Sequence, residues 1–330
     1  MFRYCASRTE AAAVVMVAAS SSWSHPTTTC KADEDSIRSL SPSSPLFIFH
    51  PNPDLEICFD TRTRTPVYVL ERLRPSAPKS HSTTNCESST KERRPHFVEE
   101  TSLPEIFRSR NFHYRHSGYD RGHMAPAADF ESGGVDTFTL INACPQSPSL
   151  NRKLWNRLEH WVRRVAQREE DDHKTVVVIT GPLWLPVAKT GDGVWEYRYP
   201  ALGQNAPSLV SVPTHFFKLV AIIRNGKIVK YAAFCVPNKE DLKDSDSSLE
   251  QYLVRWSDLE AVVGMQFFPF LIVRDDWRAL ADEATEAVWA GERLLLLLPC
   301  DAKTTKKRGA KSGDNNNNAP QHLCRAGVCK

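Results

Sequence analysis

The 330-residue sequence lacks any run approaching the roughly 20 apolar residues that a membrane-spanning helix needs. It also lacks a large excess of charge of one sign, because 42 basic and 39 acidic residues leave a formal net charge of +3. That balance does not by itself indicate a polyanionic partner, so any such signal must be local. The nine cysteines form no dense framework, and a chain this long does not depend on disulfides. We expect most of them to be free thiols.

The two ends of the chain differ in composition from the rest. Residues 1–24 are rich in Ala, Ser and Val, and they carry Arg3 and Arg8 with one acid, Glu10. This composition favours a mitochondrial targeting segment, with a secretory signal as the alternative. We therefore predict a targeting segment and linker over 1–45, one domain over 46–300, and a charged, Asn-rich, disordered tail over 301–330.

Hydrophobic patterns in the central region predict a mixture of strands and helices. Short strands are expected at 55–59, 67–70, 138–141, 175–179, 215–223 and 228–235, with a turn at 60–66 and a hairpin at Asn225-Gly226. Leu154, Leu158, Trp161, Val162 and Val165 recur at helical spacing, and further helices are expected at 249–263 and 277–289. The order shows no regular βαβ alternation, which favours an α+β fold with a central, mostly antiparallel sheet flanked by helices.

Basic residues gather in two short segments despite the small net charge. Residues 108–123 hold four arginines and three histidines against the single acid Asp120, and residues 152–168 hold six cations against Glu159. Clustered cations of this kind suit a phosphate backbone. The alternative is an ordinary solvated surface, and charge alone does not decide between the two.

Hydrolysis of a phosphodiester bond needs a base near neutral pH, a hard cation and groups that offset negative charge. The same region offers a candidate for each part: His123 as base, Asn151 and Glu159 as oxygen donors, and Arg121 and Arg163 as guanidinium groups. Each of these residues could instead have a purely structural role. Asn151 stands where a helix N-cap would stand, and Glu159 and Arg163 could form an i,i+4 surface ion pair.

Several blocks of the sequence together resemble the DNA/RNA non-specific endonuclease family, and most closely its mitochondrial members. The blocks are DRGH at 120–123, TLINACPQ at 139–146 and LNRKLWNRLE at 150–159, with DTRTRTP at 60–66, TGPL at 180–183 and VPTHFFK at 212–218. They occur in the family's order over roughly residues 55–270. The resemblance implies a ββα-metal core, in which two strands and a helix bring a histidine and a metal ligand together.

The resemblance also implies a role for each matched residue. His123 would be the general base, Asn151 the single direct protein ligand to Mg²⁺ (with Mn²⁺ as a possible substitute), and Arg121 a phosphate contact. Glu159 would hold metal-bound water, Arg163 would lie near the scissile phosphate, and Asn142 would help to order the site. The family uses one more arginine upstream, for which Arg93 and Arg94 are both candidates.

The implied activity is Mg²⁺-dependent cleavage of DNA and RNA that leaves 5′-phosphate and 3′-hydroxyl ends, by a homodimer in mitochondria. Two alternatives stay open: a nucleic-acid-binding protein that kept the fold and lost catalysis, and a secreted nuclease with the same chemistry. Cys144 departs from the family pattern, since it stands where a small residue without a thiol is usual. It is either inert packing or a point of sensitivity to oxidation.

Overall fold

The computed structural model describes residues 43–73, 95–168, 174–240, 249–271 and 277–289. The predicted targeting segment, the loop that contains Arg93 and Arg94, and the predicted C-terminal tail lie outside the described residues. Within the described ranges, no helix combines the length and the apolar character needed to cross a membrane.

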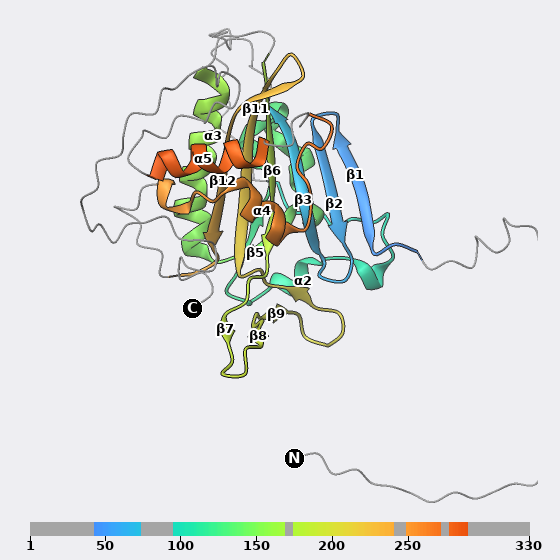
Figure 1. The fold of residues 1–330 in the computed structure, drawn as a ribbon. Helices are drawn as coiled ribbons and strands as arrows, with labels where there is room; N and C mark the ends of the chain where they lie inside the picture. The colour runs from blue at the N-terminus through green and yellow to red at the C-terminus, as the bar shows by residue number, and fades with distance from the viewer. Residues whose placement is uncertain (1–42, 74–94, 169–173, 241–248, 272–276, 290–330) are drawn as a thin grey trace, which may run out of the picture. The chain divides into compact units, whose positions relative to one another are not determined.

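A six-stranded antiparallel sheet forms the centre of the fold (Figure 1). Its spatial order is β1 (Leu46–Asn52), β2 (Leu55–Asp60), β3 (Thr65–Leu73), β6 (Lys174–Leu183), β11 (His215–Arg224) and β12 (Lys227–Pro237). The predicted hairpin joins β11 to β12, and both of its turn residues, Asn225 (φ 49°) and Gly226 (φ 69°), take the left-handed conformation that such turns require. The predicted α+β fold is confirmed.

Each face of the sheet buries its own hydrophobic core, because successive side chains of a strand point to opposite faces. On one face, Val176 and Val178 of β6 pack with Leu158 and Val162 of α3 (Asn156–Arg168), which confirms the predicted apolar face of that helix. On the other face, β11, β12 and their neighbours pack against α4 (Trp256–Val263) and α5 (Trp277–Trp289). We call these the α3 face and the α4/α5 face.

The remaining elements are short and lie in the connections. The short strand pairs are β4 (Asp120–His123) with β5 (Ala143–Gln146), β7 (Ala188–Lys189) with β8 (Trp195–Glu196), and β9 (Ala201–Leu202) with β10 (Val210–Ser211). The short helices are η1 (Glu105–Phe107), α2 (Asn111–Tyr114), η2 (Ala127–Asp129), η3 (Glu131–Thr137), η4 (Leu140–Asn142), the π-helix η5 (Leu150–Trp155) and η6 (Leu249–Tyr252).

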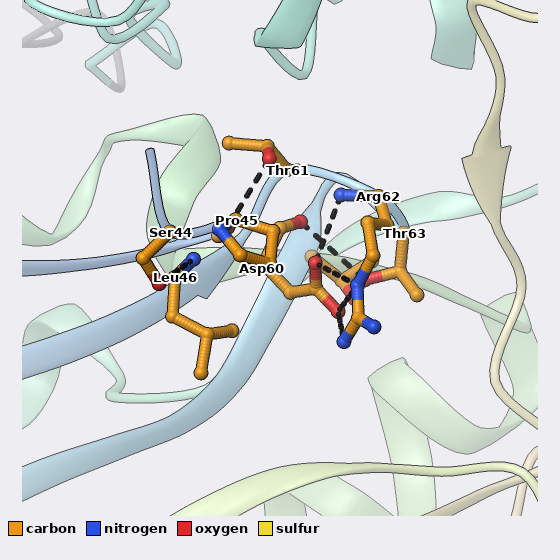
Figure 2. Close-up of polar contacts among 8 residues, drawn as sticks. Ser44, Pro45, Leu46, Asp60, Thr61, Arg62 and Thr63 are labelled. Atoms are coloured by element: carbon orange, nitrogen blue, oxygen red, sulfur yellow. Dashed lines mark hydrogen bonds and ion pairs between the residues drawn. The ribbon is translucent and has the colours of Figure 1, made fainter. Parts of the chain in front are cut away.

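The predicted turn at 60–66 connects β2 to β3, and polar contacts of Asp60 hold it closed (Figure 2). The Asp60 carboxylate accepts hydrogen bonds from the Arg62 backbone N–H at 2.8 Å and from its guanidinium group at 2.9–3.2 Å. The N–H and hydroxyl of Thr61 donate to the Pro45 carbonyl at 3.0 and 3.1 Å, which fixes the chain as it enters β1. This block therefore has a structural role in the fold.

Three predicted elements were wrong in type or extent. Residues 138–141 do not form a strand, since the short helix η4 begins at Leu140 and the strand β5 starts only at Ala143. The reason is local: the Thr139 hydroxyl accepts a hydrogen bond from the Ile141 N–H, which favours a turn. Strand β6 continues through Gly181 and Pro182, where pairing is to β11 alone and the missing proline N–H disturbs no second ladder. The helix predicted over 249–263 is reduced to η6 and α4.

Candidate active site

The β4–β5 hairpin followed by η5 and α3 forms a ββα unit on the α3 face of the sheet. In this hairpin, Gly122 pairs with Cys144 and His123 pairs with Ala143. A Cβ atom on Gly122 would stand 1.9 Å from the Gln146 Oε1 atom, and Gln146 is fully buried. Glycine at this position therefore leaves room for the buried Gln146 side chain.

Asn151 does not cap the helix, contrary to the ordinary reading of its position. Helical backbone begins at Pro148, and the Ser147 hydroxyl accepts the Leu150 N–H at 3.2 Å, so Ser147 does the capping. The Asn151 side chain instead donates from Nδ2 to the Asp120 carboxylate at 3.0 Å. Its Oδ1 atom has no hydrogen-bond partner in the described part of the chain.

Asp120 links the strand that carries His123 to the helix that carries Asn151. Its carboxylate accepts from Asn151 and, at 2.8 and 2.9 Å, from the Arg152 guanidinium group. Burial alone raises the pKa of Asp120, but the hydrogen bonds from Arg152 and Asn151 outweigh it and leave the pKa below its usual value. The carboxylate is thus ionised and holds the Asn151 amide in one orientation.

The His123 ring lies between two aromatic rings, with centroid distances of 4.6 Å to Phe97 and 4.7 Å to Phe138. Burial lowers the pKa of His123 to about 4, so the imidazole is neutral at neutral pH. Its Nε2 atom is buried and makes no hydrogen bond to any described residue. A neutral imidazole is the form of histidine that is able to accept a proton.

Arg121 lies in β4, its guanidinium group packs against α2, and it borders an open hollow beside His123. Its guanidinium group donates to the Asn111 carbonyl at 3.1 Å and stands over the Tyr114 ring at 5.2 Å. The hollow has a volume of about 360 Å³ and is lined by Pro95, His96, Phe97, Asn111 and Arg121. Phe97 lines the hollow together with Arg121 and also contacts the His123 ring. The hollow and the histidine therefore lie on either side of the same phenylalanine.

Asn142 is fully buried directly beneath the backbone that follows His123. Its Oδ1 accepts the Ala125 N–H at 3.0 Å, and its Nδ2 donates to the Ala125 and Thr137 carbonyls, both at 2.9 Å. The Met124 N–H donates to the Asn142 carbonyl at 2.9 Å. Asn142 therefore fixes the chain after His123 through its amide and does not reach the hollow.

Glu159 and Arg163 of α3 lie in a buried cluster of charges and do not form the expected surface pair. Arg163 donates to Asp129 at 2.8 Å, and the two side chains are only 18% and 1% exposed. Burial raises the pKa of Glu159 to about 7, although the nearby cations Lys218 and Arg163 lower it. Burial also raises the pKa of Asp129, against the hydrogen bond from Arg163. Asp129 and Glu159 are therefore both stabilised in their charged form by the Arg163 guanidinium group.

The oxygen donors of this region suit a hard divalent cation. Asn151 offers its unpartnered Oδ1, and Glu159 on the following helix offers a carboxylate. Such a donor set is too sparse for a cage made by protein alone, and the described residues contain no group of three or more His, Cys, Asp or Glu that could hold a metal. It fits Mg²⁺, which keeps several waters and takes one or two oxygens from the protein.

The sequence interpretation missed the residues that join these groups to one another. Asp120 belongs to the DRGH block and could have been noticed as an acid in the same block as Arg121 and His123. Asp129 has no local signal, since its partner Arg163 is 34 residues away. Cys144 is fully buried, and burial raises the pKa of its thiol well above the usual value, which supports inert packing over a reactive thiolate.

Comparisons with known proteins point to one family. A family model described as DNA/RNA non-specific endonuclease matches residues 48–271. The mitochondrial endonuclease G of Bos taurus is 34% identical over 222 residues, which cover 66% of this chain and 68% of that protein. A mitochondrial nuclease of Saccharomyces cerevisiae is 35% identical over 218 residues, covering 63% of this chain and 62% of that protein. A solved complex of EndoG with EndoGI matches with a TM-score of 0.55 and 30% identity, covering 68% of this chain and 88% of that chain. The resemblance seen in the sequence is confirmed.

Proposed function

From the premise that this chain belongs to the DNA/RNA non-specific endonuclease family and is an endonuclease, we propose that it hydrolyses both DNA and RNA with Mg²⁺ as its cation. Mn²⁺ is the expected substitute. The products would carry 5′-phosphate and 3′-hydroxyl ends. The observation that carries the proposal is the link through Asp120, which ties a neutral buried histidine and an oriented asparagine oxygen into one ββα unit.

Each residue contributes a different part of the reaction. His123 accepts the proton of the attacking water, for which its neutral ring is suited. Arg121 binds phosphate in the hollow beside it, and Arg163 supplies a second guanidinium group from α3. Asn151 would hold Mg²⁺ through Oδ1, and Glu159 of the following helix would hold metal-bound water. When bound, the cation would polarise the phosphate and offset its charge.

Asn142 is assigned a positioning role, because its three side-chain hydrogen bonds all go to backbone near His123. The upstream arginine of the family stays unassigned between Arg93 and Arg94, which lie outside the described residues. Mitochondrial location and a homodimeric state are further parts of the proposal. The first is supported by relatives named as mitochondrial and by the composition of residues 1–24, and the second by the family resemblance.

A nuclease assay on purified protein lacking residues 1–40 tests the activity, using supercoiled plasmid and RNA with Mg²⁺ and with EDTA. We expect His123→Ala to lose cleavage by a factor of about 10² to 10⁴, the usual contribution of a general base, and to keep nucleic-acid binding. His50→Ala, an exposed histidine in β1, is the matched control and should cleave normally. Full activity of His123→Ala would remove the proposed base.

The same assay separates catalysis from binding alone. Asn151→Ala should sharply weaken Mg²⁺-supported turnover, because it removes the oxygen donor. Turnover of Asn151→Ala within a few-fold of the unmodified protein would exclude the ligand role. A purified protein that binds nucleic acid and never cleaves it would favour the binding-only alternative.

Location is tested by fusing residues 1–40 to a fluorescent reporter. We expect the reporter to reach mitochondria, because residues 1–24 carry two arginines against one acid and are rich in small residues. Arrival in the secretory pathway would favour the alternative of a secreted nuclease.

A further inference from the structure

Lys218 is a buried cation that the reaction described above does not use. It lies in the centre of β11, and its side chain is 1% exposed. Its neighbours two positions away on the strand, Phe216 and Val220, both belong to the core of the α3 face. Strand alternation therefore directs the Lys218 ammonium group from the sheet toward the ββα unit.

The Lys218 ammonium group contacts the neighbouring strand of the sheet and two separate parts of that unit. It donates to the Thr180 hydroxyl of β6 at 2.7 Å and to the Met124 carbonyl at 3.4 Å. It also stands 5.0 Å from the centre of the Trp155 ring, a cation–π contact. Met124 directly follows His123, and Trp155 ends the π-helix that carries Asn151. One side chain thus touches the backbone beside the base and the helix of the metal ligand.

Acidic groups surround the same ammonium group. Glu71 of β3 is 1% exposed, and neither of its carboxyl oxygens has a hydrogen-bond partner among the residues described. Burial and the Asp129 charge raise the pKa of Glu71, and Lys218 opposes that rise. Lys218 also lowers the pKa values of Asp129 and Glu159. The cluster contains three acids and two cations, Lys218 and Arg163, so the two cations are shared.

We propose that Lys218 is a positioning residue of the nuclease reaction, which sets the separation between His123 and Asn151 by holding Met124 and Trp155 against the sheet. The proposal rests on the proposed function. An ammonium group suits the task because its three donors can satisfy a hydroxyl and a carbonyl while its charge faces an aromatic ring. An apolar side chain of equal length would fill the volume and make none of these directed contacts.

Charge balance is the competing explanation, since Lys218 also offsets the buried carboxyl of Glu71. Removing one partner of a buried charge pair is strongly destabilising whatever its effect on catalysis. The two roles separate in a double variant, Lys218→Met with Glu71→Gln. This variant removes a cation and an acid together, and it leaves the Met124 carbonyl and the Trp155 ring without the ammonium group.

The experiment compares Lys218→Met, the double variant and the control Lys227→Met, an exposed lysine at the start of β12. Thermal unfolding is measured together with kcat and KM on a plasmid substrate with Mg²⁺. We expect Lys218→Met to unfold at a lower temperature and to lose kcat by about 10- to 100-fold, as for a small misplacement of reacting groups, with KM changed less than threefold. The double variant should recover the unfolding temperature and leave kcat low.

Recovery of both unfolding temperature and kcat in the double variant would reduce Lys218 to charge balance and overturn the proposal. Retention of kcat within twofold in Lys218→Met would also overturn it. If Lys218→Met does not fold, the double variant alone decides, because its kcat is compared directly with that of the unmodified protein. An unmodified protein without cleavage would instead refute the proposed function, so the two failures are distinct.

Discussion

The buried carboxyl of Glu159 makes a quantitative prediction about stability and pH. Burial raises its pKa to about 7, from the ordinary value of 4.5. Between these two values the folded protein keeps a proton that the unfolded chain releases, so the contribution to stability is fully present below pH 4.5 and is lost as pH rises through 7. At about 1.4 kcal/mol per pKa unit, the loss is at most about 3 kcal/mol.

Glu159→Gln tests this prediction, because glutamine resembles the protonated acid at every pH. In EDTA at pH 8, the variant should have a free energy of unfolding about 2 to 3 kcal/mol greater than that of the unmodified protein. At pH 4.5 the difference should nearly vanish. Cleavage with Mg²⁺ should fall at the same time, since the carboxylate is the group proposed to act beside the cation.

Urea titrations followed by intrinsic fluorescence at both pH values measure the difference. The control is Glu196→Gln, an exposed acid in β8 whose side chain is 45% accessible, and it should change the free energy of unfolding little. The reasoning is refuted if Glu159→Gln shows the same difference at pH 4.5 and pH 8, or if it is the less stable protein at pH 8.

Three further changes test the packing around the hairpin. Gly122→Ala should destabilise the protein by about 1 to 3 kcal/mol and reduce cleavage, because its Cβ would meet Gln146 at 1.9 Å; adding Gln146→Ala should restore part of both in urea and nuclease assays. Asn142→Ala should lower the free energy of unfolding by about 3 kcal/mol or more, because several buried backbone groups lose hydrogen bonds worth about 1 kcal/mol or more each. A clearly smaller decrease in a urea titration would contradict this role. Iodoacetamide should leave Cys144 unmodified in the folded protein and label it in urea, as mass spectrometry would show, and rapid labelling of the folded protein would contradict inert packing.

Five of the six strands of the central sheet were predictable because their signal is local, whereas β1 was not predicted. The apolar run at 175–179 and the Asn225-Gly226 turn carry their conformation in a few neighbouring residues. The strand predicted at 138–141 failed for a related reason, since the run is apolar but Thr139 and Asn142 turn the chain by hydrogen bonds that hydrophobicity does not reveal.

The residue types of the candidate site could be named from the sequence, but the contacts between them could not. His123 and Asn151 stand out once the blocks are compared with a family, yet the Asp120 contact that orients Asn151 spans 31 residues of sequence. Asn151 looked like a helix cap because a cap needs only local sequence, whereas the competing partner comes from another strand. Lys218 inside an apolar run was a visible anomaly, but what it contacts depends on the register of β6 and β11.

The division of the sheet into two independent cores has a consequence for how this protein can change. Tyr231, Trp256 and Trp277 contact one another edge-on or at a tilt, with centroids 4.5–5.8 Å apart, and all three belong to the α4/α5 face. A substitution there must act through a hydrogen-bonded layer of backbone before it can move any group on the α3 face. Substitutions on the α4/α5 face, natural or engineered, should therefore change thermal stability without changing the arrangement of the groups on the α3 face.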